Sequence, residues 1–115
     1  NGIRTACFYA FQALAELFRY PERIETSSEA GQTFVLAGCR ENGEWCAVVA
    51  DFMTPHDEIR LRVEEVAGIE LEFRRLDAEN NLDPVEVRRE DGFWLLPAPC
   101  NGTTLYLVTG RKTAN

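Results

Sequence analysis

The sequence is poor in histidine and methionine, and positive charge is in deficit. Its 115 residues include one His, one Met and 12 Lys plus Arg against 19 Asp plus Glu, which gives a net charge of -7. Nucleic acids and anionic membranes bind proteins through clustered positive charge, so this balance argues against both as partners. No apolar run approaches the roughly 18 residues that a membrane-spanning helix requires.

Patterns typical of metal, nucleotide and hydrolase sites are also missing. The four cysteines show no CxxC spacing, and the only histidine, His56, has no second histidine beside it, so we expect no zinc-type site. The phosphate-binding patterns GxGxxG and GxxxxGK[ST] do not occur, and neither do GxSxG and HExxH. The sequence therefore indicates no cofactor and no catalytic residue.

Residues 77–83 are one candidate metal site in the sequence. They place oxygen-bearing side chains at alternating positions, from Asp77 to Asp83, as calcium loops do. They lack the glycine at the sixth position and the closing glutamate at the twelfth that such a loop uses. A calcium site and an acidic surface turn both remain open, and we favour the turn.

The first twenty residues are the most apolar part of the chain. Thr5 is a suitable N-cap, the run from Ala6 to Arg19 contains neither Gly nor Pro, and Pro21 ends it, so we predict a helix over residues 5–19. Its polar residues form only a narrow stripe, made of Gln12, Glu16 and Arg19.

An amphipathic surface helix buries about a third to a half of its circumference, whereas this one needs cover on most sides. A sheet of the same chain would provide that cover. A second body outside this chain would provide it as well, and both interpretations stay open.

After Pro21 the hydrophobic pattern alternates, as it does in strands. We predict eight of them, separated by turn-forming residues: Arg23–Ser27, Thr33–Arg40, Glu44–Met53, Glu58–Val66, Ile69–Leu76, Pro84–Arg89, Gly92–Leu96 and Thr104–Thr109. Short strands at a spacing of about ten residues are typical of an antiparallel sandwich. We expect one mainly β domain over residues 1–115: an antiparallel β-sandwich of about eight strands with the N-terminal α-helix packed on it.

Asn42 and Gly43 predict a tight hairpin. A two-residue turn at this point would pair Cys39 directly with Cys46, close enough for a disulfide. Two separate buried thiols are the alternative, which we favour. Free thiols are typical of proteins in a reducing compartment, and this favours a cytoplasmic location. Because both faces of this hairpin are apolar, we expect the opposite sheet to cover one face and the helix to cover the other.

The two tryptophans are the candidate ligand-binding residues. Trp45 and Trp94 have flat apolar faces of the kind on which sugar rings stack, so they could bind an oligosaccharide. Packing inside the sandwich is the competing interpretation.

Several segments resemble one enzyme family. Residues 5–17, TACFYAFQALAEL, resemble the last barrel helix of clan A glycoside hydrolases, and in particular the YYAFKAFxEL phrase of family 39 β-xylosidases. The later segments resemble strands of the β-sandwich that follows that barrel: residues 23–27, residues 47–52, residues 72–80 (similar to a YRLDEEH stretch), and residues 95–99 with 104–108 (similar to a closing LPPNSVxLI).

This resemblance implies a C-terminal accessory domain of a longer glycosidase. The family's acid/base stands in an Asn-Glu-Pro motif on a barrel strand, its nucleophile also lies on the barrel, and no Asn-Glu-Pro occurs in this chain. The implied role is non-catalytic: to buttress a (β/α)8 barrel, which would be the main partner. A carbohydrate-binding module using Trp45 and Trp94 is the alternative function, and self-association of the isolated chain is a further candidate. Because the chain begins at Asn1 and its only methionine is Met53, we expect a processed product or a piece of a longer protein.

Overall fold

The computed structural model describes residues 12–24, 33–52, 57–63, 67–77, 79–98 and 102–113. This part of the chain contains a helix over residues 12–17 and nine strands: β1 (Glu22–Ile24), β2 (Thr33–Cys39), β3 (Trp45–Phe52), β4 (Glu58–Leu61), β5 (Ile69–Leu76), β6 (Asn81–Val85), β7 (Arg88–Glu90), β8 (Phe93–Pro97) and β9 (Thr103–Lys112). The strands form a six-stranded sheet in the order β1-β2-β3-β9-β5-β6 and a three-stranded sheet in the order β4-β8-β7. All the pairings are antiparallel.

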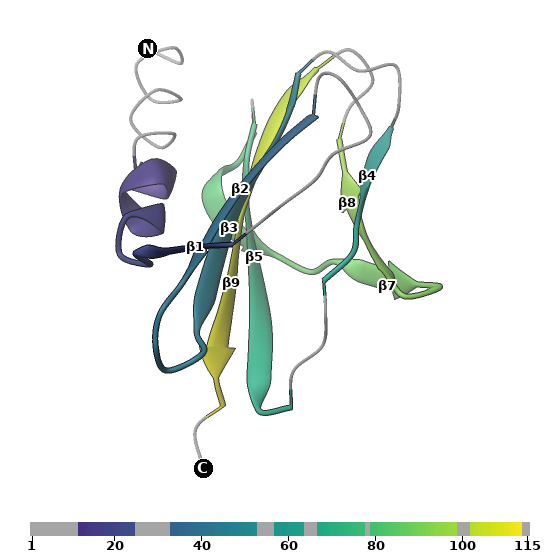
Figure 1. Cartoon of the computed structure of the whole chain (residues 1–115). Helices are drawn as coiled ribbons and strands as arrows, with labels where there is room; N and C mark the ends of the chain where they lie inside the picture. Colours follow the sequence, from purple (N-terminus) through teal and green to yellow (C-terminus); the bar gives the residue numbers. More distant parts are fainter. Residues whose placement is uncertain are drawn as a thin grey trace.

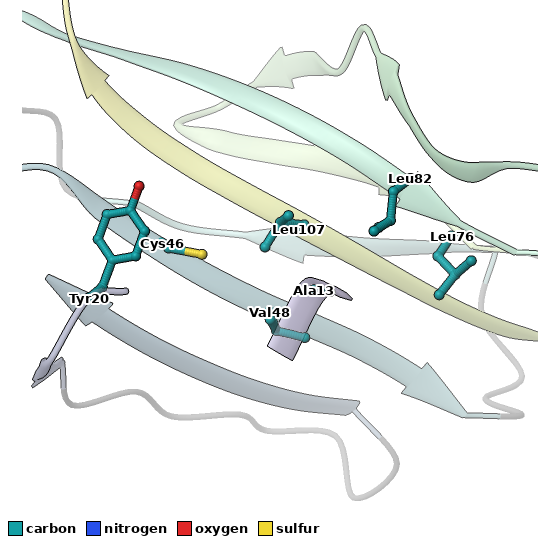
Figure 2. Close-up of a cluster of buried hydrophobic side chains, with 7 residues drawn as sticks. All are labelled: Ala13, Tyr20, Cys46, Val48, Leu76, Leu82 and Leu107. Atoms are coloured by element: carbon teal, nitrogen blue, oxygen red, sulfur yellow. The ribbon is translucent and has the colours of Figure 1, made fainter. Parts of the chain in front are cut away.

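The helix and the two sheets form three layers, with the six-stranded sheet in the middle (Figure 1). One apolar cluster fills the space between the two sheets, and its fully buried members are Val49, Leu96, Tyr106 and Val108. A second cluster lies between the six-stranded sheet and the helix (Figure 2). The predicted mainly β antiparallel sandwich with a helix packed on it is confirmed.

Strand β3 contributes to both clusters. Trp45, Ala47 and Val49 face the three-stranded sheet, and Cys46 and Val48 face the helix. A strand that is buried on both sides carries a continuous apolar run instead of an alternating one, which explains the sequence of β3. The expectation that this hairpin is covered on both faces is confirmed for β3, whereas Phe34 and Leu36 of β2 are exposed.

The register predicted for this hairpin is wrong by one residue. Cys39 pairs with Trp45, and Cys46 pairs with Gly38. A shift of one residue moves a side chain to the other face of a sheet, so Cys39 and Cys46 lie on opposite faces, and both are free thiols. Burial raises the pKa of Cys46 to about 12, so this thiol is neutral at physiological pH.

The turn itself explains the shift. The Arg40 N–H donates to the Glu44 carbonyl (2.8 Å), and the Gly43 N–H donates to the Arg40 carbonyl (3.0 Å). Three residues therefore separate Arg40 from Glu44, and Gly43 takes a φ of 91°. This is a three-residue loop with glycine in the left-handed position, where the prediction assumed two residues.

Two further boundaries differ from the prediction. The single strand expected over Pro84–Arg89 is divided between β6 and β7, which belong to different sheets. Pro84 lies in β6, an edge strand, where a missing N–H breaks no ladder. The predicted helix over residues 5–19 is observed over residues 12–17, and residues 5–11 lie outside the described part.

A buried tyrosine joins the two sheets. Tyr106 on β9 has no exposed surface, and its hydroxyl donates to the carbonyl oxygen of Pro97 on β8. Burial raises the pKa of Tyr106 to about 12, so the neutral phenol is maintained. A hydrogen bond satisfied within the core fixes the position of one sheet relative to the other.

Candidate functional site

The side of the six-stranded sheet that carries the helix is called the helix-side face. The helix rests on it through Ala13, which has no exposed surface, and through Leu17. Figure 2 shows Ala13 above Val48 of β3, with Cys46 and Tyr20 further along the same surface. The described part of the helix therefore packs on a sheet of its own chain.

A glycine makes room for the chain that leaves the helix. A Cβ built on Gly38 of β2 would lie 2.3 Å from the carbonyl oxygen of Tyr20 and 3.3 Å from that of Glu22. Tyr20 itself is only 4% exposed. The absence of a side chain at Gly38 lets the connection between the helix and β1 lie directly against the sheet.

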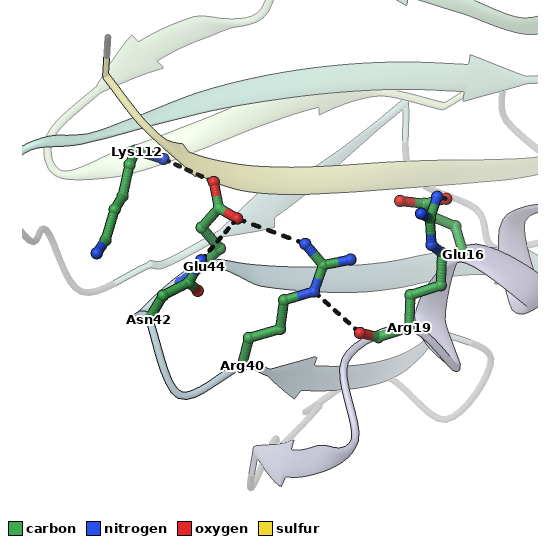
Figure 3. A network of polar contacts seen from close by, with 6 residues as sticks. All are labelled: Glu16, Arg19, Arg40, Asn42, Glu44 and Lys112. Atoms are coloured by element: carbon green, nitrogen blue, oxygen red, sulfur yellow. Dashed lines mark hydrogen bonds and ion pairs between the residues drawn. The ribbon is translucent and has the colours of Figure 1, made fainter. Parts of the chain in front are cut away.

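An arginine from the hairpin holds the end of the helix (Figure 3). Nε of Arg40 donates to the carbonyl oxygen of Arg19 at 3.0 Å, and its guanidinium lies 4.1 Å from the centre of the Tyr20 ring. Unpaired carbonyl groups at a helix C-terminus attract positive charge, so this contact is favourable. Burial raises the pKa of Tyr20, with Arg40 acting in the opposite direction.

Glu44 fixes this arginine in place. Its carboxylate accepts hydrogen bonds from the backbone N–H of Lys112 (3.1 Å) and the side-chain amide of Asn42 (3.1 Å), and it pairs with Arg40 at 3.4 Å (Figure 3). The hydrogen bond from Lys112, followed by that from Asn42, lowers the pKa of Glu44. The charged carboxylate thus ties the hairpin, the end of β9 and Arg40 together.

We expect Arg40→Met to destabilise the protein by about 1–2 kcal/mol, because a charge-assisted hydrogen bond to the helix end is lost. Chemical denaturation followed by circular dichroism measures this. Arg74→Met is the matched control, since Arg74 pairs with Glu72 on the surface at 2.9 Å. An exposed pair contributes under about 1 kcal/mol. Equal losses in the two variants would contradict this role for Arg40.

Three large apolar side chains remain exposed on or beside this face. Phe18, at the end of the helix, is 83% exposed, Phe34 is 54% exposed and Leu36 is 46% exposed. Phe34 and Leu36 are two residues apart on β2 and share the face of Val48, which pairs with Leu36. Exposed apolar side chains that cluster on one surface mark interaction sites. The part of the chain that the structure describes therefore leaves large apolar side chains of this face exposed.

The predicted sugar-binding residues lie between the sheets. Trp45 and Trp94 are half-buried and pack against the inter-sheet cluster. The ring of Trp94 lies 5.1 Å from that of Phe73, and the guanidinium carbon of Arg89 lies 5.4 Å from its centre. The two indoles come from different sheets. Sugar stacking by Trp45 and Trp94 stays a prediction.

Within the segment 77–83, the Asp77 carboxylate accepts hydrogen bonds from residues that follow it, and Asn81–Asp83 already belong to β6. Oδ1 of Asp77 accepts from the backbone N–H groups of Glu79 (2.9 Å) and Asn80 (2.8 Å), and Nε of Arg75 lies 2.7 Å from Oδ2. Burial acts to raise the pKa of Asp77, but the hydrogen bond from the Asn80 side-chain amide, those from the two N–H groups and the charge of Arg75 outweigh it and lower the pKa. Within the described ranges, no group of three or more His, Cys, Asp or Glu is placed to hold a metal ion.

Some predictions concern residues outside the described part. These are His56, Cys7 and Cys100. Among the residues that the structure does describe, no helix is long and apolar enough to cross a membrane.

Comparison with known proteins gives two informative structures. No protein-family model and no curated protein matches the chain. A family 30 endoxylanase from Clostridium papyrosolvens C71 superposes with a TM-score of 0.66 at 15% identity, over 90% of this chain and 27% of that one. A family 30 subfamily 8 xylanase from Clostridium acetobutylicum superposes with a TM-score of 0.55 at 14% identity, over 77% of this chain and 23% of that one. The chain has the fold of part of a family 30 glycoside hydrolase.

This likeness supports the resemblance drawn from the sequence at the level of the clan. Family 30 belongs to clan A, as the resemblance implied, but nothing in the comparison favours family 39. The chain spans about a quarter of the length of each xylanase that it matches. The likeness is therefore one of fold, between this chain and a part of each xylanase.

Proposed function

We propose that this chain is a non-catalytic accessory domain of a glycoside hydrolase. It packs through its helix-side face against a catalytic (β/α)8 barrel that the chain does not contain. The barrel supplies the acid/base and the nucleophile, and the sandwich stabilises the barrel. The parent enzyme would act on xylan, as the xylanases of the same fold do, or on the shorter substrates of a xylosidase.

The exposed apolar side chains on the helix-side face carry this proposal. Phe18, Phe34 and Leu36 are large enough for their burial against a partner to contribute roughly 1.5–3 kcal/mol each before the entropy cost of association. The helix packs on the same sheet, and Arg40 holds its end through a hydrogen bond to the carbonyl oxygen of Arg19. The length of the fold neighbours supports a partner of considerable size, because about three quarters of each is unmatched.

The test is binding to the barrel encoded in the same reading frame. The barrel segment and the 115-residue chain are produced separately, and their association is measured by analytical ultracentrifugation and surface plasmon resonance. We expect a stable one-to-one complex. The double variant Phe18→Asp/Leu36→Asp is expected to weaken it at least tenfold, since it places two charges in an apolar contact.

Ala67→Asp provides the control. Ala67 is exposed in the turn before β5, away from the helix, so the new charge should leave binding unchanged. Circular dichroism establishes that each variant is folded. A folded chain with no affinity for the barrel would exclude the buttressing role, and equal weakening by Ala67→Asp would exclude the helix-side face as its site.

A further inference from the structure

Asn42 and Gly43 form a pair of residues that can react with each other. The backbone nitrogen of Gly43 can attack Cγ of the Asn42 side chain. The new N–Cγ bond closes a succinimide ring, and Nδ2 leaves as ammonia together with the proton of the attacking amide. Water then opens the ring at either carbonyl carbon, which gives aspartate or isoaspartate. Glycine favours the attack, because it has no side chain to hinder the approach.

The folded hairpin restrains both reacting groups. The Gly43 N–H, whose nitrogen would attack, donates to the carbonyl oxygen of Arg40 at 3.0 Å. Oδ1 of Asn42 accepts from the backbone N–H of Glu44 at 3.0 Å, and Nδ2 donates to the Glu44 carboxylate at 3.1 Å (Figure 3). The reaction requires these groups to leave their partners, so it must wait for a local opening of the turn.

The turn is nevertheless open to solvent. Glu41, Asn42 and Gly43 are all exposed, and a Cβ built on Gly43 would meet nothing within 4 Å. Water, the second reactant, therefore has access to Asn42 at all times. The hydrogen bonds of the turn, and not burial, are what slow the reaction.

The charge that the reaction creates would lie beside Glu44. Nδ2 of Asn42 (3.1 Å) and Nη1 of Arg40 (3.4 Å) both contact Oε1 of this carboxylate. The N–H of Lys112, followed by the Asn42 amide, lowers the pKa of Glu44. A carboxylate at position 42 cannot donate to Oε1, and two like charges in contact repel each other. The group that orients Arg40 is therefore the group that the reaction disturbs.

We propose that Asn42 is a latent deamidation site and that its conversion to aspartate or isoaspartate releases the end of the helix from the sheet. The new carboxylate repels Oε1 of Glu44 and attracts the guanidinium of Arg40. Figure 3 shows Asn42 and Arg19 on opposite sides of Arg40, so the arginine is drawn away from the carbonyl oxygen of Arg19 that it now holds.

Isoaspartate has a second effect on the hairpin. It carries the backbone through the side-chain carbon, so the three-residue loop loses its spacing. Neither product returns to asparagine by itself, and the released state therefore accumulates as the protein ages. This inference does not depend on the proposed contact with a barrel.

Ageing of the 115-residue chain at neutral pH, in buffer and in urea, tests the first part. Peptide mapping by mass spectrometry measures aspartate and isoaspartate at position 42. In urea, we expect Asn42 to react as fast as Asn101, which also precedes a glycine in the sequence. In buffer, we expect a rate at least about tenfold lower, because the hairpin must first open. Equal rates for Asn42 in buffer and urea, or no conversion in urea, would overturn the proposal.

Hydrogen exchange of the variant Asn42→Asp tests the second part. This variant carries one product of the reaction and keeps an oxygen that can accept from the Glu44 N–H. We expect the amides of residues 12–17 to exchange about tenfold faster than in the original chain, while those of β9 keep their protection. A helix that keeps its protection in this variant would show that conversion does not release it.

Asn80→Asp is the matched control. Asn80 also donates its side-chain amide to a carboxylate, Oδ1 of Asp77 at 3.0 Å, but that carboxylate pairs with Arg75 and not with Arg40. The same change of charge should therefore leave the exchange of residues 12–17 as it is. Equal acceleration of the helix in Asn80→Asp and Asn42→Asp would assign the effect to added negative charge in general and would overturn the proposal.

Discussion

Alanine in place of Gly110 is expected to destabilise the sandwich by about 2–3 kcal/mol. Gly110 pairs with Trp45 across β9 and β3. A Cβ at Gly110 would lie 2.3 Å from Nε1 of the Trp45 indole and 2.6 Å from its Cε2. The indole is rigid and packs against the inter-sheet cluster, so it cannot turn aside without disturbing the core.

Urea denaturation monitored by tryptophan fluorescence and circular dichroism measures the loss. Gly43→Asn is the control, because Gly43 has open space around it and asparagine tolerates its positive φ. The decisive comparison is made in a Trp45→Ala background, where the clash is gone. There the change at Gly110 should cost less than about 1 kcal/mol. An equal cost in both backgrounds would show that the indole is not what limits this position.

The positions of most strands could be predicted from the sequence. The bounds of β5, Ile69–Leu76, are those predicted, because alternating apolar residues report burial on one side. The order of strands could not be predicted in this way. β9 lies between β3 and β5, so the end of the described chain occupies the middle of the large sheet. No local pattern records a pairing between segments that far apart in sequence.

The exposure of Phe34 and Leu36 on the helix-side face depends on one turn. A two-residue loop at Asn42 and Gly43, as predicted, would place both side chains on the face of Trp45. The observed three-residue loop puts them on the helix-side face, where they are exposed. The sequence does hold a signal for this longer loop, since a glycine at the third position permits the left-handed conformation. Two-residue and three-residue hairpins both accept the same Asn-Gly pair, so register must come from tertiary packing.

The helix-side face was partly predictable for a different reason. An apolar helix next to a strand that is apolar on both faces implies a contact between them, and the structure contains that contact at Ala13 and Val48. The anchoring groups were not visible in the pattern. Gly38 leaves room for the carbonyl oxygen of Tyr20, and Arg40 donates a hydrogen bond to that of Arg19. These residues become neighbours only after the chain has folded back on itself.

Gly38→Val is expected to release the helix and to destabilise the protein by about 3 kcal/mol. The group in the way is the backbone carbonyl of Tyr20, 2.3 Å from the new Cβ, and backbone cannot move aside as a flexible side chain does. The connection must lift from β2, which separates Arg40 from the helix end and uncovers Ala13.

Hydrogen exchange followed by mass spectrometry separates this local effect from general destabilisation. In Gly38→Val, the amides of residues 12–17 should lose protection while those of β3 and β9 keep most of theirs. Val49→Ala is the comparison, since it removes volume from the inter-sheet cluster and should lower protection on both sheets without singling out the helix. If the helix keeps its protection in Gly38→Val, the glycine is not its anchor. Should the helix be released as expected, the same variant should also lose its affinity for the barrel, because the docking face depends on a helix that is fixed to the sheet.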